Sequence, residues 1–262
     1  MRRAALCALT AAALLAGCAT AQRPDPLEPL NRKVFAFNEA VDAAVLKPTA
    51  EVYRAVLPTP AQIAVSNFFG NLKDAWSAVN LLLQGRVADS LSDVMRVGTN
   101  TVFGFMGVMD IATELGFERH GEDFGQTLGR WGVPPGAYIV WPLLGPSTVR
   151  DSVGLPVDML ATPESLVNVS VTRNSMTALR LVSTRAGLLS TTGLLDDIAL
   201  DKYAFVRTAY LQRRRSLVYD GNPPEEDDED DLPPVAAPAP ETPAAPASAA
   251  AAEPPASRAS GN

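Results

Sequence analysis

Apolar residues recur at helical spacing along most of this 262-residue chain. One set advances in steps of four and three residues, at Leu30, Val34, Phe37, Val41 and Ala44. A second set repeats the same steps, at Val87, Leu91, Val94, Gly98 and Thr101. Because these steps follow the 3.6-residue turn, each set shares one side of an α-helix. Strand-like alternation is rare, so the pattern predicts an all-α protein.

Proline, glycine and capping residues mark where the predicted helices begin and end. Thr59 and Pro60 have the order of an N-cap followed by a proline in the first turn, and Gly85 is placed to end a helix. Gly70 predicts a break between two helices, and Asp201 can cap the last one. We therefore expect further helices over residues 52–57, 60–69, 72–84, 148–160, 175–189 and 201–218.

The segment between Arg130 and Arg150 contains nineteen consecutive residues without a charge. This is close to the ~20 apolar residues of a membrane-crossing helix. Prolines and glycines interrupt the segment, at Gly132, Pro134, Pro135, Gly136, Pro142, Gly145 and Pro146. They make one continuous helix implausible. We expect an irregular, loop-rich segment that packs against protein or lines a wet cavity, because bare lipid could not satisfy its backbone.

A shorter uncharged run covers residues 97–109, between Arg96 and Asp110. Its thirteen residues are too few to cross a bilayer. The sequence leaves two interpretations open. The run is either a buried core helix, or a segment that lies at a membrane interface or beside an apolar cavity.

The N-terminus has the pattern of a bacterial lipoprotein signal. Arg2 and Arg3 precede an apolar run at residues 4–16, and small residues stand directly before Cys18. This arrangement is a lipobox, so residues 1–17 are predicted to be a signal peptide that is removed before Cys18.

Cys18 is then the predicted site of acylation, and each buried methylene would contribute ~0.8 kcal/mol to membrane attachment. Ala19, which follows it, favours sorting to the outer membrane over retention in the inner one. Cys7, the other of the two cysteines, would leave with the signal. The mature chain would therefore contain no disulfide and no cysteine-based metal or redox site.

Residues 222–262 have a different composition from the body, residues 18–221. Ten of these 41 residues are proline and twelve are alanine, and residues 225–231 are all acidic. Such a tail cannot bury enough apolar surface to fold, so we expect it to be disordered. The body contains nineteen basic and twenty acidic residues, and this near-neutral balance gives no electrostatic argument for nucleic acid. Its length fits one domain.

The residues needed for common enzyme chemistry are missing. His120 is the one histidine, and no G-x-S-x-G motif accompanies it. No G-x-x-x-x-G-K-[ST] loop is present for a nucleotide. Neighbouring acids such as Glu122 and Asp123 are most simply helix caps or solvated side chains. We expect a binding protein that is not an enzyme and that has no cofactor or metal.

Several long motifs, in this order, resemble the MlaA (VacJ) family of outer-membrane lipoproteins. They are DPLEPLNRKVFAFN (25–38), NFFGNL (67–72), NLLLQG (80–85), NTVFGFMGVMDIA (100–112), EDFGQTLGRWGV (122–133), PLLGPSTVRDSVG (142–154) and DKYAFVRTAYLQRR (201–214). The resemblance covers about residues 25–221. The chain departs from the family pattern at residues 133–138, where many members have G-x-G-P-Y, and near residues 74–75, where many have a proline.

The resemblance implies a ring-like helical domain embedded in the outer membrane from the periplasmic side, with an amphipathic channel. It also implies that the stretch beginning at about Gly125 is an irregular Pro/Gly-rich hairpin that flanks the channel. Such a protein removes phospholipids misplaced in the outer leaflet and passes them to a soluble periplasmic carrier. Trimeric porins are the family's membrane partners. Two alternatives to this function remain: an envelope scaffold that uses the acidic tail, and a lipid hydrolase.

We assign candidate roles to two groups of residues within this framework. The first group is expected to face lipid or the channel wall: Phe103, Phe105, Met106, Val108, Met109, Trp131, Tyr138, Ile139, Val140, Trp141, Leu143 and Leu144. The second group, Asn38 and Asn100, is expected to place polar side chains near the channel.

Overall fold

The computed structural model describes residues 25–162, 165 and 167–224. The predicted signal peptide, Cys18 and nearly all of the predicted tail lie outside the described residues. The chain divides into two compact units, Met1–Pro223 and Pro224–Asn262. The boundary falls close to the predicted end of the body, and only the first unit is described below.

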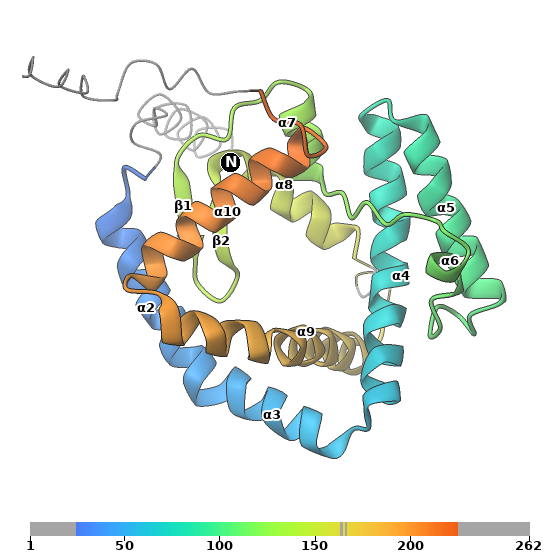
Figure 1. The fold of residues 1–262 in the computed structure, drawn as a ribbon, viewed down its shortest axis with the longest axis horizontal. Helices are drawn as coiled ribbons and strands as arrows, with labels where there is room; N and C mark the ends of the chain where they lie inside the picture. Colours follow the sequence, from blue (N-terminus) through green and yellow to red (C-terminus); the bar gives the residue numbers. More distant parts are fainter. Residues whose placement is uncertain (1–24, 163–164, 166, 225–262) are drawn as a thin grey trace, which may run out of the picture. The chain divides into compact units, whose positions relative to one another are not determined.

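The first unit is mostly helical, as the sequence predicts (Figure 1). Its helices are α2 (Glu28–Val41), the π-helix η1 (Asp42–Leu46), α3 (Lys47–Val56), α4 (Thr59–Leu83), α5 (Val87–Val102), α6 (Ile111–Glu114), α7 (Phe124–Arg130), α8 (Val149–Leu160), α9 (Ser170–Ile198) and α10 (Lys202–Val218). Strands β1 (Tyr138–Trp141) and β2 (Gly145–Thr148) form an antiparallel hairpin. Within the described ranges, no helix is both long and apolar enough to cross a membrane.

The helix boundaries differ from the prediction at several points. The predicted break at Gly70 is wrong, because α4 continues from Thr59 to Leu83. A Cβ at Gly70 would lie only 3.2 Å from the Arg119 guanidinium, so this glycine permits a close side-chain approach instead of ending a helix. Pro58, not Thr59, is the N-cap of α4. The Asp201 cap is confirmed, since its side chain accepts from the amide of Ala204.

Contacts between elements form a closed circuit within the first unit (Figure 1). Each element of the circuit contacts the next one in this order: α2, η1, α3, α9, α4, α7, α8, β2 and β1. Strand β1 then contacts α2 and closes the circuit. Helix α5 packs against α4, with α6 against α5, and α10 contacts α7 and β2. Elements far apart in sequence are therefore neighbours around one loop of contacts.

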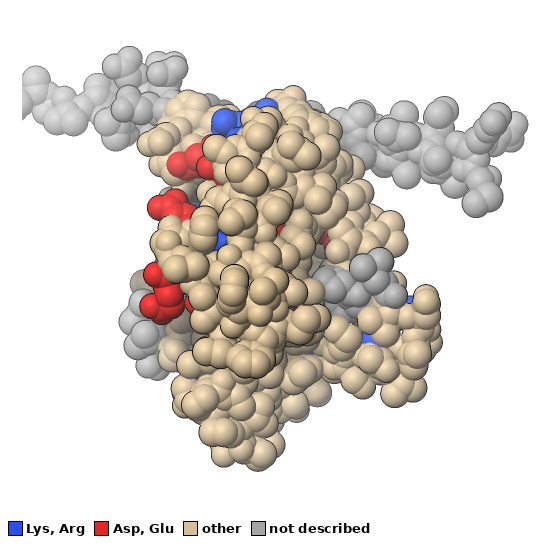
Figure 2. Space-filling view, turned by 90° about the vertical axis from the view of Figure 1, so that its right-hand side faces the viewer, with Lys and Arg blue, Asp and Glu red and all other residues tan. Residues whose placement is uncertain are grey.

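The burial pattern of α5 is the reverse of that expected in water. Its buried side chains are polar or charged, namely Ser90, Asp93, Arg96, Thr99 and Asn100. Its exposed side chains include Val87, Leu91 and Val94 of the predicted apolar face, together with Met95 and Val102. Figure 2 shows the side of the unit that carries α5 and α6, where acidic side chains gather along one edge and few charges lie elsewhere.

Apolar cores are correspondingly small in the described residues. One cluster joins Ala50 and Tyr53 of α3 to Ala186 of α9. Another joins Tyr138 and Val140 of β1 to Tyr203 of α10. The Tyr138 ring meets the rings of Tyr203 and Tyr210 edge-on, with centroids 6.2 and 6.1 Å apart. These contacts attach the hairpin to α10.

Candidate functional site

The connection between α5 and α6 carries a group of exposed apolar side chains. We call residues 103–109 the apolar loop. Phe103, Phe105 and Met106 are 70%, 76% and 68% exposed, and Val108 and Met109 are also exposed. This arrangement excludes the buried core helix that the sequence had left open. A concentrated apolar surface of this kind is typical of an interaction site.

The backbone of the apolar loop is held in an unusual conformation. Phe105 and Met106 have positive φ angles of 51° and 62°, which are uncommon for residues with a side chain. Gly107 has φ +87°, and a Cβ there would lie 2.6 Å from Nδ2 of Asn71. The loop therefore needs a glycine at this position and an external support that fixes its shape.

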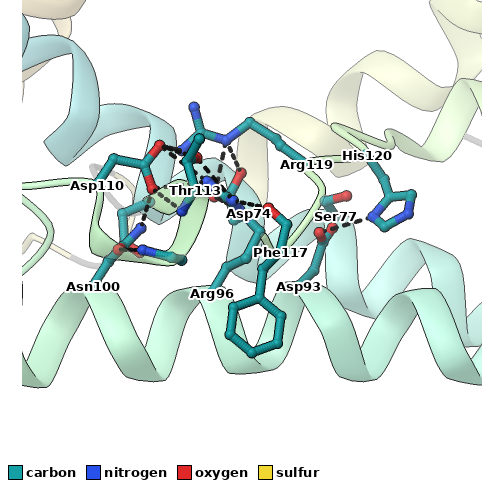
Figure 3. Close-up of polar contacts among 12 residues, drawn as sticks. Asp74, Ser77, Asp93, Arg96, Asn100, Asp110, Thr113, Phe117, Arg119 and His120 are labelled. Atoms are coloured by element: carbon teal, nitrogen blue, oxygen red, sulfur yellow. Dashed lines mark hydrogen bonds and ion pairs between the residues drawn. The ribbon is translucent and has the colours of Figure 1, made fainter. Parts of the chain in front are cut away.

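Buried polar side chains supply that support (Figure 3). The Asn100 side chain donates to Asp110 at 3.0 Å and accepts from the amide of Ala112 at 2.8 Å. The Asn100 carbonyl accepts from the amide of Gly107. Asn100 is 1% exposed and its hydrogen bonds reach both ends of the loop, so it anchors the loop. Its expected place near a channel stays a prediction.

Arg96 occupies the centre of this network (Figure 3). Its guanidinium lies 3.2 Å from the carboxylate of Asp74 and 3.0 Å from that of Asp110, and it donates to the carbonyl of Phe117 at 2.5 Å. Arg119 approaches Asp74 at 3.0 Å from the other side. Burial raises the pKa of Asp110, but hydrogen bonds from Thr113 and Asn100 and the charge of Arg96 outweigh burial and bring the pKa to about 2. This acid therefore remains ionised.

The hairpin places its predicted lipid-facing residues on two sides. Tyr138 and Val140 are buried in the core with α2 and α10, so the prediction that they face lipid or a channel is wrong. The reason is strand alternation, which turns every second side chain inward. Ile139 is half-buried, while Trp141, Leu143 and Leu144 are exposed.

Asn38 fixes the tip of the hairpin. Its side chain donates to the carbonyl of Trp141 at 2.9 Å and accepts from the amide of Leu143 at 2.8 Å. Leu143 itself has a positive φ of 64°. The side-chain amide of Asn38 is thus used by the hairpin backbone, and the expectation that Asn38 lies near a channel stays a prediction.

Trp131 lies at the end of α7 and is 54% exposed. Its indole nitrogen donates to the carbonyl of Leu83 at 3.1 Å, and its ring meets that of Phe124 edge-on. A tryptophan with one end hydrogen-bonded and the rest exposed is suited to the boundary between lipid and water.

A cavity of about 500 Å³ lies between α4, α8 and α9. Its lining is amphipathic: Ser66, Phe69, Gly70, Leu72, Lys73 and Trp76 from α4, Glu122 and Asp123 before α7, Asp158, Ala161 and Thr162 from the end of α8, and Arg180, Ser183 and Thr184 from α9. We refer to it as the amphipathic cavity. Sequence reasoning missed it, because its walls come from segments that are distant along the chain. The helical spacing of residues 66, 69, 73 and 76 is the one signal that could have indicated a shared wall.

Two acids of the amphipathic cavity are already engaged. Glu122 accepts from Gln84 at 3.0 Å and lies 3.3 Å from Arg86. Asp123 accepts from Arg214 through both oxygens, at 2.5 and 2.9 Å. Both acids therefore have the contacts expected of structural groups, and these contacts fit a catalytic role less well.

His120 makes contacts that do not form a catalytic triad. Its Nδ1 lies 3.0 Å from Asp93, and its Nε2 lies 3.7 Å from Asp89. Among the described residues, no serine or other nucleophile forms a hydrogen bond with this ring, and no group of three potential metal ligands is present. A hydrolase mechanism would need both a nucleophile and a base.

Comparison with known proteins gives a consistent match. The sequence pattern of the MlaA lipoproteins matches residues 23–217. The proteins named "Intermembrane phospholipid transport system lipoprotein MlaA" in Shigella flexneri and Escherichia coli (strain K12) are each 35% identical over 217 residues, covering 79% of this chain and 86% of theirs. The protein of that name in Haemophilus influenzae is 33% identical over 236 residues, covering 82% of this chain and 90% of its own.

A solved structure also matches the fold. It is described as "Structural basis for maintenance of bacterial outer membrane lipid asymmetry", and it superposes with a TM-score of 0.66 and 34% sequence identity. The match covers 75% of this chain and all of the solved one. Since the family pattern covers most of the chain and the relatives exceed 30% identity over most of both lengths, the resemblance read from the motifs is confirmed: the chain belongs to the MlaA lipoprotein family.

Proposed function

We propose that this chain is an outer-membrane lipoprotein that takes part in intermembrane phospholipid transport. In finer detail, it removes phospholipids misplaced in the outer leaflet and passes them through an amphipathic passage to a periplasmic lipid carrier. Membership of the MlaA family supports the general role, because relatives across most of the chain are named for that transport system.

The reversed burial of α5 is the observation that carries the proposal. Val87, Leu91 and Val94 face outward, while Asp93 and Arg96 of the same helix face inward. In water this orientation would leave apolar surface unprotected and bury charges at a cost. In lipid it is the favourable one, since acyl chains solvate the outer face and buried polar groups pair with one another.

The apolar loop and the hairpin tip extend this outward apolar surface. Phe103, Phe105 and Met106 project from the loop, and Leu143 and Leu144 from the hairpin. Neither segment has the regular backbone of a membrane-spanning helix. Each is held by internal hydrogen bonds, so it can meet lipid at the interface without exposing an unsatisfied backbone.

The energetics explain why an amphipathic passage would suffice. Moving two acyl chains through water exposes roughly thirty methylenes at ~0.8 kcal/mol each, or about 24 kcal/mol. A wall that offers polar groups to the headgroup and leaves the tails in hydrocarbon removes most of this cost. The amphipathic cavity, with Lys73 and Arg180 beside Phe69 and Trp76, is our candidate for part of that passage.

The remaining partners follow from the family resemblance. Trimeric porins would hold the protein laterally in the membrane, and acyl chains on Cys18 would anchor it from the periplasmic side. The direction of transfer would come from the carrier and from whatever empties it, because this chain needs no fuel under the proposal.

The test is the phospholipid content of the outer leaflet in a strain that lacks the gene. A membrane-impermeant amine reagent applied to intact cells measures the aminophospholipid at the surface. We expect labelling to rise in the deletion strain and to return to normal with the wild-type gene or with the matched variant Phe105→Leu. We expect Phe105→Glu to restore it poorly. Unchanged surface labelling in the deletion strain would remove the proposed function.

A further inference from the structure

The walls of the amphipathic cavity contain one acid and one lysine that form no ion pair within the described residues. The acid is Asp158 near the end of α8, and the lysine is Lys73 on α4. The other two lining acids, Glu122 and Asp123, are paired with Arg86 and Arg214. The cavity therefore offers one available charge of each sign for a ligand.

Asp158 is held so that one of its oxygens remains available. Its Oδ1 accepts from the indole nitrogen of Trp76 at 2.8 Å and from the amide of Phe124 at 2.9 Å. Among the described residues, no donor forms a hydrogen bond with Oδ2. Burial raises the pKa of Asp158, and the hydrogen bonds from Phe124 and Trp76 together with the charge of Arg214 offset burial only in part.

Lys73 supplies the opposite charge. Its ammonium lies 3.9 Å from the position that a Cβ would take at Gly121, so it reaches over the segment that leads to Glu122. No ion pair of Lys73 occurs within the described part of the chain, and Lys73 and Asp158 do not pair with each other. Arg180 lines the same cavity from α9, next to Ser183 and Thr184.

We propose that the amphipathic cavity selects phospholipids whose headgroup carries a primary ammonium. The phosphate lies at Lys73 on the α4 wall, and the ammonium donates to Oδ2 of Asp158. This inference rests on the proposed function, since it names the lipid class that the same passage prefers. The apolar residues Phe69 and Leu72 of the same wall lie beside the first carbons of the tails.

Headgroup chemistry explains the selectivity. A primary ammonium has N–H donors and forms a charge-assisted hydrogen bond with a carboxylate, whereas a choline group has none. A glycerol headgroup can donate from its hydroxyls but carries no positive charge, so it leaves the Asp158 carboxylate uncompensated. Ethanolamine should therefore rank above choline and glycerol headgroups, while all three share the phosphate contact at Lys73.

The experiment is a lipid competition on the full-length acylated protein in a non-ionic detergent. The protein is incubated with equimolar phosphatidylethanolamine, phosphatidylcholine and phosphatidylglycerol that have identical acyl chains, and bound lipids are counted by native mass spectrometry. Ser183→Trp fills the cavity and gives the background from lipid on the outer surface. Asp158→Asn keeps an oxygen for Trp76 and Phe124 but removes the charge. Glu114→Gln and Lys47→Gln are matched controls at exposed sites.

We expect the wild type to hold phosphatidylethanolamine about tenfold more than the other two lipids, a difference of ~1.4 kcal/mol. Asp158→Asn should abolish this preference while total binding persists. Lys73→Gln should lower the binding of all three lipids, and the two control variants should behave as the wild type. Equal binding of the three lipids by the wild type, or an unchanged preference in Asp158→Asn, would overturn the selectivity and leave the transport proposal standing. If lipid binding by the wild type does not exceed the Ser183→Trp background, the cavity is not a lipid site and the inference is overturned. The proposed function is tested separately, by the surface labelling of the deletion strain.

Discussion

Arg96 and Asp74 form an ion pair at 3.2 Å in which each side chain is only 1% exposed. The pair joins α5 to α4 from the inside, while Leu91 and Val94 of α5 face outward. Charges therefore hold these two helices together at their contact, and apolar side chains cover the outside. A buried pair of this kind is costly to break, because removing one partner leaves the other charge uncompensated.

Arg96→Met should destabilise the protein by about 3–5 kcal/mol, since it leaves Asp74 and Asp110 with only Arg119, at 3.0 and 3.6 Å. The measurement is the free energy of unfolding from denaturant titration in detergent. Arg54→Met is the matched control, because Arg54 is exposed, and it should change stability by no more than about 0.5 kcal/mol. Equal effects of the two substitutions would show that the network in Figure 3 does not support the fold.

Asn38→Ala should loosen the tip of the hairpin, because Trp141 and Leu143 each lose a hydrogen bond to the Asn38 side chain. The loss should amount to about 1–3 kcal/mol of local stability. Hydrogen exchange of the Leu143 amide measures it directly and should become faster. Gln212→Ala on the exposed side of α10 serves as the control, and protection that persists at Leu143 would contradict the assignment.

Acid should weaken the anchor of the apolar loop through Asp110. Its pKa is lowered from 3.8 to about 2 in the folded protein, so the unfolded chain binds the proton more tightly than the folded one. The resulting stabilisation is complete above about pH 4 and is lost as the pH falls through the folded value. Unfolding measured between pH 5 and 2 should show a smaller acid loss in Asp110→Asn, with Glu114→Gln as the control. An identical pH slope in Asp110→Asn and the wild type would contradict this role.

His120→Ala should leave lipid function intact. The ring contacts the carboxylates of Asp93 and Asp89, and it makes no hydrogen bond to a nucleophile within the described residues. Surface labelling of a deletion strain that carries the variant should match the wild-type strain. Labelling as high as in the strain without the gene, with normal protein levels, would instead support a hydrolase.

The sequence predicted only part of what the structure shows for α5, whose apolar side chains face outward and whose polar side chains are buried. Periodicity correctly placed Val87, Leu91 and Val94 on one face, because spacing alone determines which side chains share a face. It could not say whether that face meets a core or lipid, since both are apolar. The other face of α5 decides this question. It carries Asp93 and Arg96, and the structure buries both.

The site was harder to predict than the fold. The uncharged stretch identified the hairpin region but not its strand alternation, which turns Tyr138 and Val140 into the core. Asn38 and Asn100 were identified as important polar residues, but each hydrogen-bonds a backbone far away in sequence or across a loop. Such pairings depend on tertiary contacts, which local sequence patterns do not predict. The same holds for Lys73 and Asp158, which line one cavity from different helices.

The most direct test of the account is how deeply the outer face of α5 lies in the bilayer. A single cysteine in place of Leu91 is labelled with an environment-sensitive fluorophore in the full-length protein in nanodiscs, and Gln212→Cys on α10 is the reference. The account predicts that nitroxides on the acyl chains quench the label at position 91 strongly and the label at position 212 weakly, while aqueous iodide does the reverse. A label at position 91 that iodide quenches fully and acyl-chain nitroxides do not would contradict the membrane-facing orientation of α5.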